Sequence, residues 1–212
     1  SHNICDILQA FLYIMSLLHK SGNPLQRELT WRWYEGENSV NIFQVLSQGK
    51  SRLHEPSMSA MLGYLLDSNK DHGLGDAFIR KFVEHQDNPA FQNILDAGFI
   101  NSQVSLEEPY QLNGSRKDID IQIIILDSNK DEAHRIIIEN KIKIGAASPK
   151  QLDHYYRAIL EEENDIQNLH MIFLTPNSKA KQLETEFANL ELQIDSSHSK
   201  NWIFWADDEN TK

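Results

Sequence analysis

The fold of this sequence is decided by two stretches, DIDIQIIIL at Asp118–Leu126 and HRIIIENKI at His134–Ile142. In both, β-branched residues alternate with other residues, which is typical of β-strands. They are separated by the polar run DSNKDEA at Asp127–Ala133, which predicts a turn. We therefore predict an antiparallel hairpin centred between Asn129 and Lys130.

This centre determines which residues lie opposite each other. Ile121 faces Ile138 and Ile123 faces Ile136, so one face of the hairpin is apolar. A slip of one residue would separate these isoleucines and exchange the two faces of the strand. The apolar pairing therefore supports the register.

The other face of the hairpin carries charge. In this register Asp120 faces Glu139 and Asp118 faces Lys141. Directly opposed side chains have Cβ atoms about 4.5–5.5 Å apart, and like charges at that separation are destabilising. The Asp–Glu pair becomes favourable with a divalent cation between the carboxylates, because Mg²⁺ prefers oxygen ligands. Lys141 lies on the same face, where it could hold a water, help to deprotonate it, or stabilise charge on a phosphate.

A plainer interpretation stays open, because D-x-D and E-x-K are common in strands. Asp118 and Lys141 can form an ordinary cross-strand salt bridge. Asp120 and Glu139 can simply face solvent.

The flanking segments carry apolar residues at helical spacing, together with two further apolar runs. Helices are predicted at Ile4–His19, Asn38–Gln48, Ser57–Leu66, Leu74–His85, Ala90–Ala97, Pro149–Glu163 and Lys179–Leu190, and strands at Leu169–Thr175 and Asn201–Trp205. This order predicts the α/β class, with a mixed β-sheet flanked by helices and a helical N-terminal part. We expect one domain over residues 1–212, in which residues 1–52 form the N-terminal extension and residues 53–205 the core.

Composition limits the classes of protein. The net charge of −11 argues against non-specific coating of nucleic acid by the whole surface, but it allows a local basic track. Arg116, Lys117, Lys143 and Lys150 surround the charged hairpin in sequence and are candidates for such a track. The single cysteine, Cys5, excludes an intrachain disulfide, and we expect a cytoplasmic protein. No apolar run approaches the roughly 18 residues of a membrane span, and neither zinc-ligand spacing nor a phosphate-binding P-loop motif occurs.

An acidic residue in one strand followed by E-x-K in the next resembles the PD-(D/E)XK nuclease superfamily. The match is closest to a bacterial and phage branch with the pattern G-R-I-D-I-x-I, then I-I-I-E-N-K-I, then a Q-L-x-x-Y helix. The corresponding residues are Ile119-Asp120-Ile121, Ile137 to Ile142 and Gln151 to Tyr155, preceded by Glu55, Ser59, Leu62, Leu65-Leu66-Asp67, His72-Gly73, Gly75 and Phe78. In order, these cover roughly residues 53–175. The lead-in Ser115 to Asp118 departs from the pattern, so Asp118 competes with Asp120 as the acidic ligand, and the pairing with Glu139 favours Asp120.

The resemblance implies a restriction-endonuclease-like core and phosphodiester hydrolysis assisted by Mg²⁺ or Mn²⁺. It implies that Asp120 and Glu139 ligate the metal, that the Asn140 carbonyl is a candidate third ligand, and that Lys141 positions or activates water. It also implies that Glu55 approaches the metal from the helical side. The alternative for Glu55 is stabilisation of a helix N-terminus before Pro56.

The resemblance further suggests that Gln151 contacts Lys141, water or a backbone phosphate, and that Tyr155 either joins it or belongs to the core. For His72 a structural role is expected, with contact to a phosphate as the alternative. The implied partner is nucleic acid, with DNA expected, no membrane, and a homodimer left open. The rival hypothesis is a catalytically silent module that keeps the fold to bind nucleic acid or a protein. A purely structural domain would leave the charged hairpin unexplained.

Overall fold

The computed structural model describes residues 55–142, 149–163, 165–176, 180–193 and 196–205. Its centre is a five-stranded sheet in the order β1-β2-β3-β4-β5. The strands are β1 (Asn101–Leu112), β2 (Ser115–Leu126), β3 (Glu132–Asn140), β4 (Leu169–Thr175) and β5 (Ser199–Phe204). The first three are antiparallel and the last three parallel, so the sheet is mixed, as predicted.

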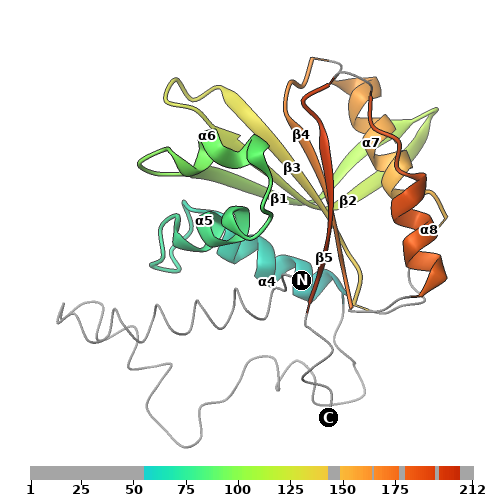
Figure 1. Cartoon of the computed structure of the whole chain (residues 1–212), viewed down its shortest axis with the longest axis horizontal. Coiled ribbons are helices and arrows are strands. Elements are labelled where there is room, and N and C mark those ends of the chain that lie inside the picture. The colour runs from blue at the N-terminus through green and yellow to red at the C-terminus, as the bar shows by residue number, and fades with distance from the viewer. Residues whose placement is uncertain (1–54, 143–148, 164, 177–179, 194–195, 206–212) are drawn as a thin grey trace, which may run out of the picture.

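Helices cover both faces of this sheet (Figure 1). One layer contains α4 (Glu55–Leu66), α5 (Ala77–Glu84), the short 3-10 helix η1 (Pro89–Phe91) and α6 (Gln92–Leu95); the other contains α7 (Gln151–Glu162) and α8 (Lys181–Asn189). The second layer contains the crossovers between parallel strands, since α7 connects β3 to β4 and α8 connects β4 to β5. The predicted α/β architecture is confirmed.

The two layers enclose separate hydrophobic cores. Ile121, Ile123 and Ile138 pack with α4 and α5, whereas Ile137 packs with α7. Both faces of the central strands are therefore apolar, which explains the near-continuous β-branched sequence. A polar or charged residue buried in this hairpin needs a specific partner.

The hairpin register is confirmed along most of its length. Ile121 pairs with Ile138 and Ile123 pairs with Ile136, while a shift follows between Ile125 and Leu126 near the turn. In the other direction the ladder between β2 and β3 ends at the Ile121–Ile138 pair. The predicted pairs Asp120–Glu139 and Asp118–Lys141 therefore lie beyond the residues that are paired in the β2–β3 ladder.

Strand β1 was not predicted. Its sequence, NSQVSLEEPYQL, contains few β-branched residues and a proline, Pro109. Proline is tolerated in β1 because an edge strand has one side without a hydrogen-bonded neighbour. Glu107 adopts a left-handed φ of 51°, and the pairing with β2 skips this residue.

Some predicted helix ends shift. The helix predicted from Leu74 begins at Ala77, because Gly75 adopts a φ of 54° in the preceding turn. The segment Ala90–Ala97 forms η1 and a single turn of α-helix. The helices predicted at Ile4–His19 and Asn38–Gln48 lie outside the described residues. In the part of the chain that is described, no helix combines the length and apolarity needed to cross a bilayer.

Candidate active site

The candidate site lies where β2 and β3 separate. Just past the last ladder pair, the backbone N–H of Asn140 donates to Oδ2 of Asp120 over 2.9 Å. The Asp120 carboxylate thus bonds to the end of β3, between Glu139 and Lys141 in sequence. This contact brings the three residues predicted from the hairpin into one place.

Glu139 is the most unusual residue of the site. Its side chain is 1% exposed, and within the described residues neither carboxylate oxygen has a hydrogen bond of ordinary geometry. It forms an ion pair with Lys141, whose own side chain is 5% exposed, and it lies against the Asp120 carboxyl group. A buried carboxylate normally accepts several hydrogen bonds. Glu139 therefore retains unused capacity to bind a cation.

Glu55 joins the site from the first turn of α4. Its Oε1 lies 3.3 Å from Nζ of Lys141, and its Oε2 accepts from the N–H of Ile142 over 3.2 Å. Glu55 also stands at the start of the helix, where a negative charge is favourable. Both interpretations of Glu55 are compatible with this position.

The electrostatics follow from three carboxylates around one ammonium. Burial, reinforced by the Asp120 charge, raises the pKa of Glu139 to about 8. Burial likewise raises the pKa of Asp120, although Lys141 opposes the shift. Burial disfavours the ammonium form of Lys141 and so lowers its pKa. The neighbouring carboxylates, Glu139 foremost, have a larger effect in the opposite direction, and the pKa of Lys141 is raised overall. Without a further cation, the carboxylates retain protons more strongly than they would in water.

These residues fit a divalent cation. Among the described residues, no three His, Cys, Asp or Glu side chains form a ready-made metal cluster. Mg²⁺, however, commonly binds one or two carboxylates and completes its shell with water and substrate phosphates. The buried Glu139 carboxylate lies beside Asp120, and its Oε1 contacts the Lys141 ammonium while neither oxygen has a hydrogen bond of ordinary geometry among the described residues, which matches that requirement.

Helix α7 adds a tyrosine. The Nε2 of Gln151 donates to the hydroxyl of Tyr155 over 2.7 Å. Burial, together with the Glu139 and Asp120 charges, raises the pKa of Tyr155 far above its usual range. Tyr155 is therefore a protonated phenol close to the carboxylates. The spacing of four residues in α7 was the signal for its proximity to Gln151.

Other predicted residues lie elsewhere. Asp118 is exposed and pairs with Arg116 over 2.6 Å, so the expected Asp118–Lys141 pair does not form. The strands diverge before that point, which is the physical reason. His72 has the expected structural role, because its Nδ1 accepts from the N–H of Leu74 and its Nε2 contacts the carbonyl of Asp67.

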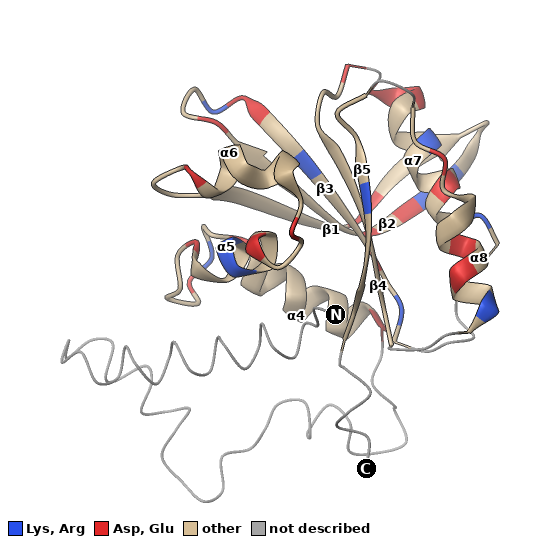
Figure 2. Cartoon of the chain, viewed as in Figure 1, with Lys and Arg blue, Asp and Glu red and all other residues tan. Residues whose placement is uncertain are grey.

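The proposed basic track is only partly described. Lys143 lies outside the described residues. Lys150 stands just before α7 with a left-handed φ of 60°, and its backbone N–H donates to Glu186. Figure 2 shows acidic and basic residues interspersed along the strands and helices of both layers.

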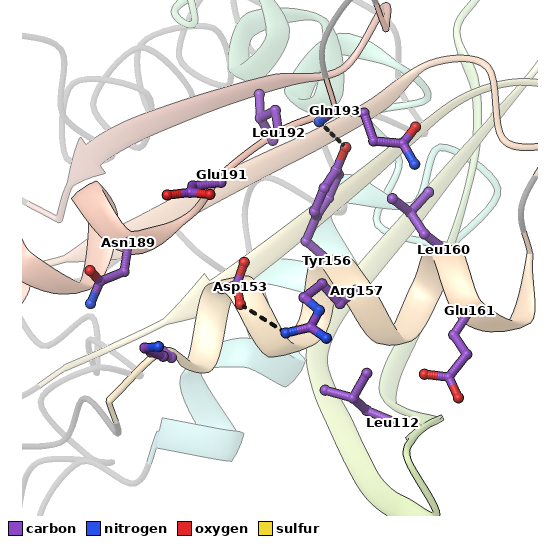
Figure 3. Close-up of a pocket in the computed structure, with 11 residues that line it drawn as sticks. Leu112, Asp153, Tyr156, Arg157, Leu160, Glu161, Asn189, Glu191, Leu192 and Gln193 are labelled. Atoms are coloured by element: carbon purple, nitrogen blue, oxygen red, sulfur yellow. Dashed lines mark hydrogen bonds and ion pairs between the residues drawn. The ribbon is translucent and has the colours of Figure 1, made fainter.

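A separate open groove of about 750 Å³ lies beside α7 (Figure 3). It runs between that helix and the segment after α8, and its lining comprises Leu112, Lys150, Asp153, Tyr156, Arg157, Leu160, Glu161, Asn189, Glu191, Leu192 and Gln193. None of the candidate catalytic residues lines it. The chemistry predicted from the hairpin therefore belongs to the carboxylates and not to this groove.

Comparison with protein families agrees with the geometry. A model of the PD-(D/E)XK nuclease superfamily matches residues 40–205. The chain belongs to the PD-(D/E)XK nuclease superfamily. The match spans every described element, including Glu55 and the β2–β3 hairpin. Searches of curated proteins and of solved structures find no match.

Membership of this superfamily indicates nuclease activity in general and a nucleic-acid substrate. Its members typically use divalent metals, in keeping with a buried Glu139 carboxylate that has few hydrogen bonds among the described residues. The mixed sheet flanked by helices agrees with the restriction-endonuclease-like core that the resemblance implied.

Proposed function

We propose that this chain hydrolyses phosphodiester bonds in nucleic acid, with DNA as the expected substrate and Mg²⁺ or Mn²⁺ as the cofactor. The observation that carries the proposal is the buried Glu139 carboxylate, which has no ordinary hydrogen-bond partner among the described residues and lies beside Asp120 and Lys141. A buried carboxylate with so few hydrogen bonds destabilises the fold, and a bound divalent cation would offset that cost.

Each residue has a distinct role in this proposal. Asp120 and Glu139 would hold the cation, with Glu55 as an additional ligand that also keeps Lys141 in place. Lys141 would position the attacking water or neutralise a phosphate oxygen through its ammonium. Gln151 would orient Tyr155 and the substrate backbone beside them. When bound, the cation lowers the pKa of water and offsets charge on the phosphate.

The test is cleavage by Asp120→Ala and Lys141→Ala, with Asp118→Ala as the matched control. Asp118 lies on the same strand but is exposed and pairs with Arg116. With Mg²⁺ or Mn²⁺, the wild type and Asp118→Ala should cut duplex DNA, single-stranded DNA or RNA, whereas the other two should lose activity at least about a hundredfold. Equal activity of the wild type and the two site variants would refute the proposal.

A second candidate is a catalytically silent module, favoured by the net charge of −11 and by the Lys141 ammonium already seated between two carboxylates. Calorimetry with Mn²⁺ separates the two. A nuclease should bind the ion through Asp120 and Glu139, whereas a silent module need not bind it.

A further inference from the structure

Asn140 connects four elements of the site. It is fully buried, at 0% exposure, between Glu139 and Lys141 in sequence. Its Oδ1 accepts from Nε1 of Trp205, just past β5, over 2.9 Å, and its Nδ2 donates to Oγ of Ser59 in α4 over 3.0 Å. Its backbone N–H donates to Asp120 in β2. One residue of β3 thus bonds to α4, β2 and the end of β5.

The bond to Ser59 has a consequence for Glu55. The two residues are four apart in α4 and share a face of the helix. Ser59 contacts the side chain of Asn140, and Glu55 contacts the N–H of Ile142, two residues further along. Helix α4 therefore contacts the end of β3 at two adjacent points, and the hydrogen bond between Asn140 and Ser59 is the fully buried one.

We propose that Asn140 is a positioning residue, whose side chain fixes Glu55 relative to Asp120 and Glu139. This inference rests on the proposed function, because the positioned groups are the metal-binding carboxylates. Asn140 contacts no substrate in this role. Its amide acts by holding α4 and the end of β5 against β3, while its main chain orients Asp120.

The variants Ser59→Ala and Trp205→Phe each remove one partner of the Asn140 amide without changing a candidate ligand. Loss of such outer partners typically weakens metal binding about 10- to 100-fold. Ser59→Thr keeps the hydroxyl and should restore binding. Ser68→Ala is the matched control, because it removes a buried serine hydroxyl just after α4, where Oγ accepts from the N–H of Ser102 over 2.9 Å, far from the carboxylates.

The measurement is Mn²⁺ affinity by calorimetry on the full chain, with thermal unfolding recorded for every variant. The inference predicts weaker binding, by about tenfold or more, in Ser59→Ala and Trp205→Phe, and wild-type affinity in Ser59→Thr and Ser68→Ala. If the wild type binds Mn²⁺ and Ser59→Ala binds it equally well, the positioning role is wrong and the proposed function stands. Equal weakening in Ser68→Ala would also overturn the role, because the effect would then follow stability alone. A wild type that binds no Mn²⁺ would overturn the metal site itself, and the positioning role with it.

Discussion

Strand β3 buries two charged residues four positions apart on the same face, Arg135 and Glu139, whose side chains differ in how fully they are hydrogen-bonded. The Arg135 guanidinium donates to Glu132, to Glu163 and to the hydroxyl of Tyr110, at distances from 2.6 to 2.8 Å. Glu139 has an ion pair with Lys141 and, among the described residues, no hydrogen bond of ordinary geometry.

We interpret this difference as that between a structural charge, Arg135, and a proposed metal ligand, Glu139. A buried charge costs stability unless it is paired and hydrogen-bonded. Arg135 meets that condition and ties β3 to β1 and to Glu163, just past α7. Glu139 meets it only in part, because it is ion-paired with Lys141 but lacks hydrogen bonds of ordinary geometry among the described residues, and a second carboxylate, Asp120, raises the cost further. The fold tolerates this cost at the site where a divalent cation would remove it.

The strongest test of this comparison is the substitution Glu139→Gln, which keeps the shape of the side chain and removes its carboxylate. We expect cleavage to fall at least about a hundredfold, because the lost group is a proposed ligand and even outer partners cost 10- to 100-fold. Thermal stability should stay the same or rise, because the repulsion between Glu139 and Asp120 is removed while Lys141 keeps its ion pair with Glu55. Loss of both activity and stability would mean that Glu139 is structural, like Arg135.

Arg135→Met should give the reverse pattern. Breaking a buried ion pair costs about 3–5 kcal/mol. The side chains of Glu132 and Glu163 are 29% and 39% exposed, so solvent compensates in part and we expect about 2–3 kcal/mol. Urea unfolding measures the loss, and Mn²⁺ affinity of the folded variant should match the wild type. Unchanged stability would contradict the structural assignment of Arg135.

Mn²⁺ binding should depend on pH through Glu139. Its pKa is raised to about 8, and a ligand carboxylate must lose its proton to bind metal. Affinity should therefore increase up to about tenfold per pH unit as pH rises toward 8 and then level off. Calorimetry in two buffers of different ionisation enthalpy should detect proton release below pH 8, and Glu139→Gln should lack it. Binding that is independent of pH would place the ion on other groups.

The histidines at the opposite end of β3 should make stability depend on pH. His134 Nδ1 lies 3.0 Å from Nε2 of His170, and His170 Nδ1 lies 2.7 Å from Oγ of Ser199. Burial, together with the neighbouring histidines, lowers the pKa of His170 to about 3. Below pH 6.5 His170 binds a proton in the unfolded chain but not in the folded chain. The free energy of unfolding therefore falls as pH falls, by up to about 1.4 kcal/mol per pH unit.

Urea unfolding of Glu139→Gln between pH 4 and 7 measures this slope without the contribution of Glu139. The Glu139→Gln variant is used because the raised pKa of Glu139 has the opposite effect on stability. Between about pH 4.5 and 8 the folded state holds a proton that the unfolded state releases, so stability falls as pH rises. Adding His170→Gln should reduce the acid slope, and the pKa of His134, which burial also lowers, should account for a remaining part of it. An unchanged slope would show that His170 is not its source.

The parts of the fold predicted from sequence are those where burial dictates the residue type. Strand β4 is buried along its whole length and was predicted with its observed bounds, Leu169–Thr175. The isoleucines predicted the β2–β3 register because a slip of one residue would separate Ile121 from Ile138 and Ile123 from Ile136. Strand β1 was missed because an edge strand tolerates Pro109 and polar residues.

The candidate site divides in the same way. Proximity of Asp120 and Glu139 followed from period-two alternation across a hairpin, a local rule. The resemblance supplied the approach of Glu55 from α4, which no spacing in the sequence encodes. The bonds from Asn140 to Ser59 and Trp205 join residues 81 and 65 positions apart, and long-range side-chain contacts of this kind leave no periodic signal.

The most direct test of the metal site is anomalous scattering from crystals grown with Mn²⁺. The account predicts a peak within coordination distance of the carboxylates of Asp120 and Glu139, with Lys141 displaced from Glu139 or turned toward a bound water. A fully occupied Mn²⁺ elsewhere, with Glu139 still paired to Lys141 alone, would contradict it.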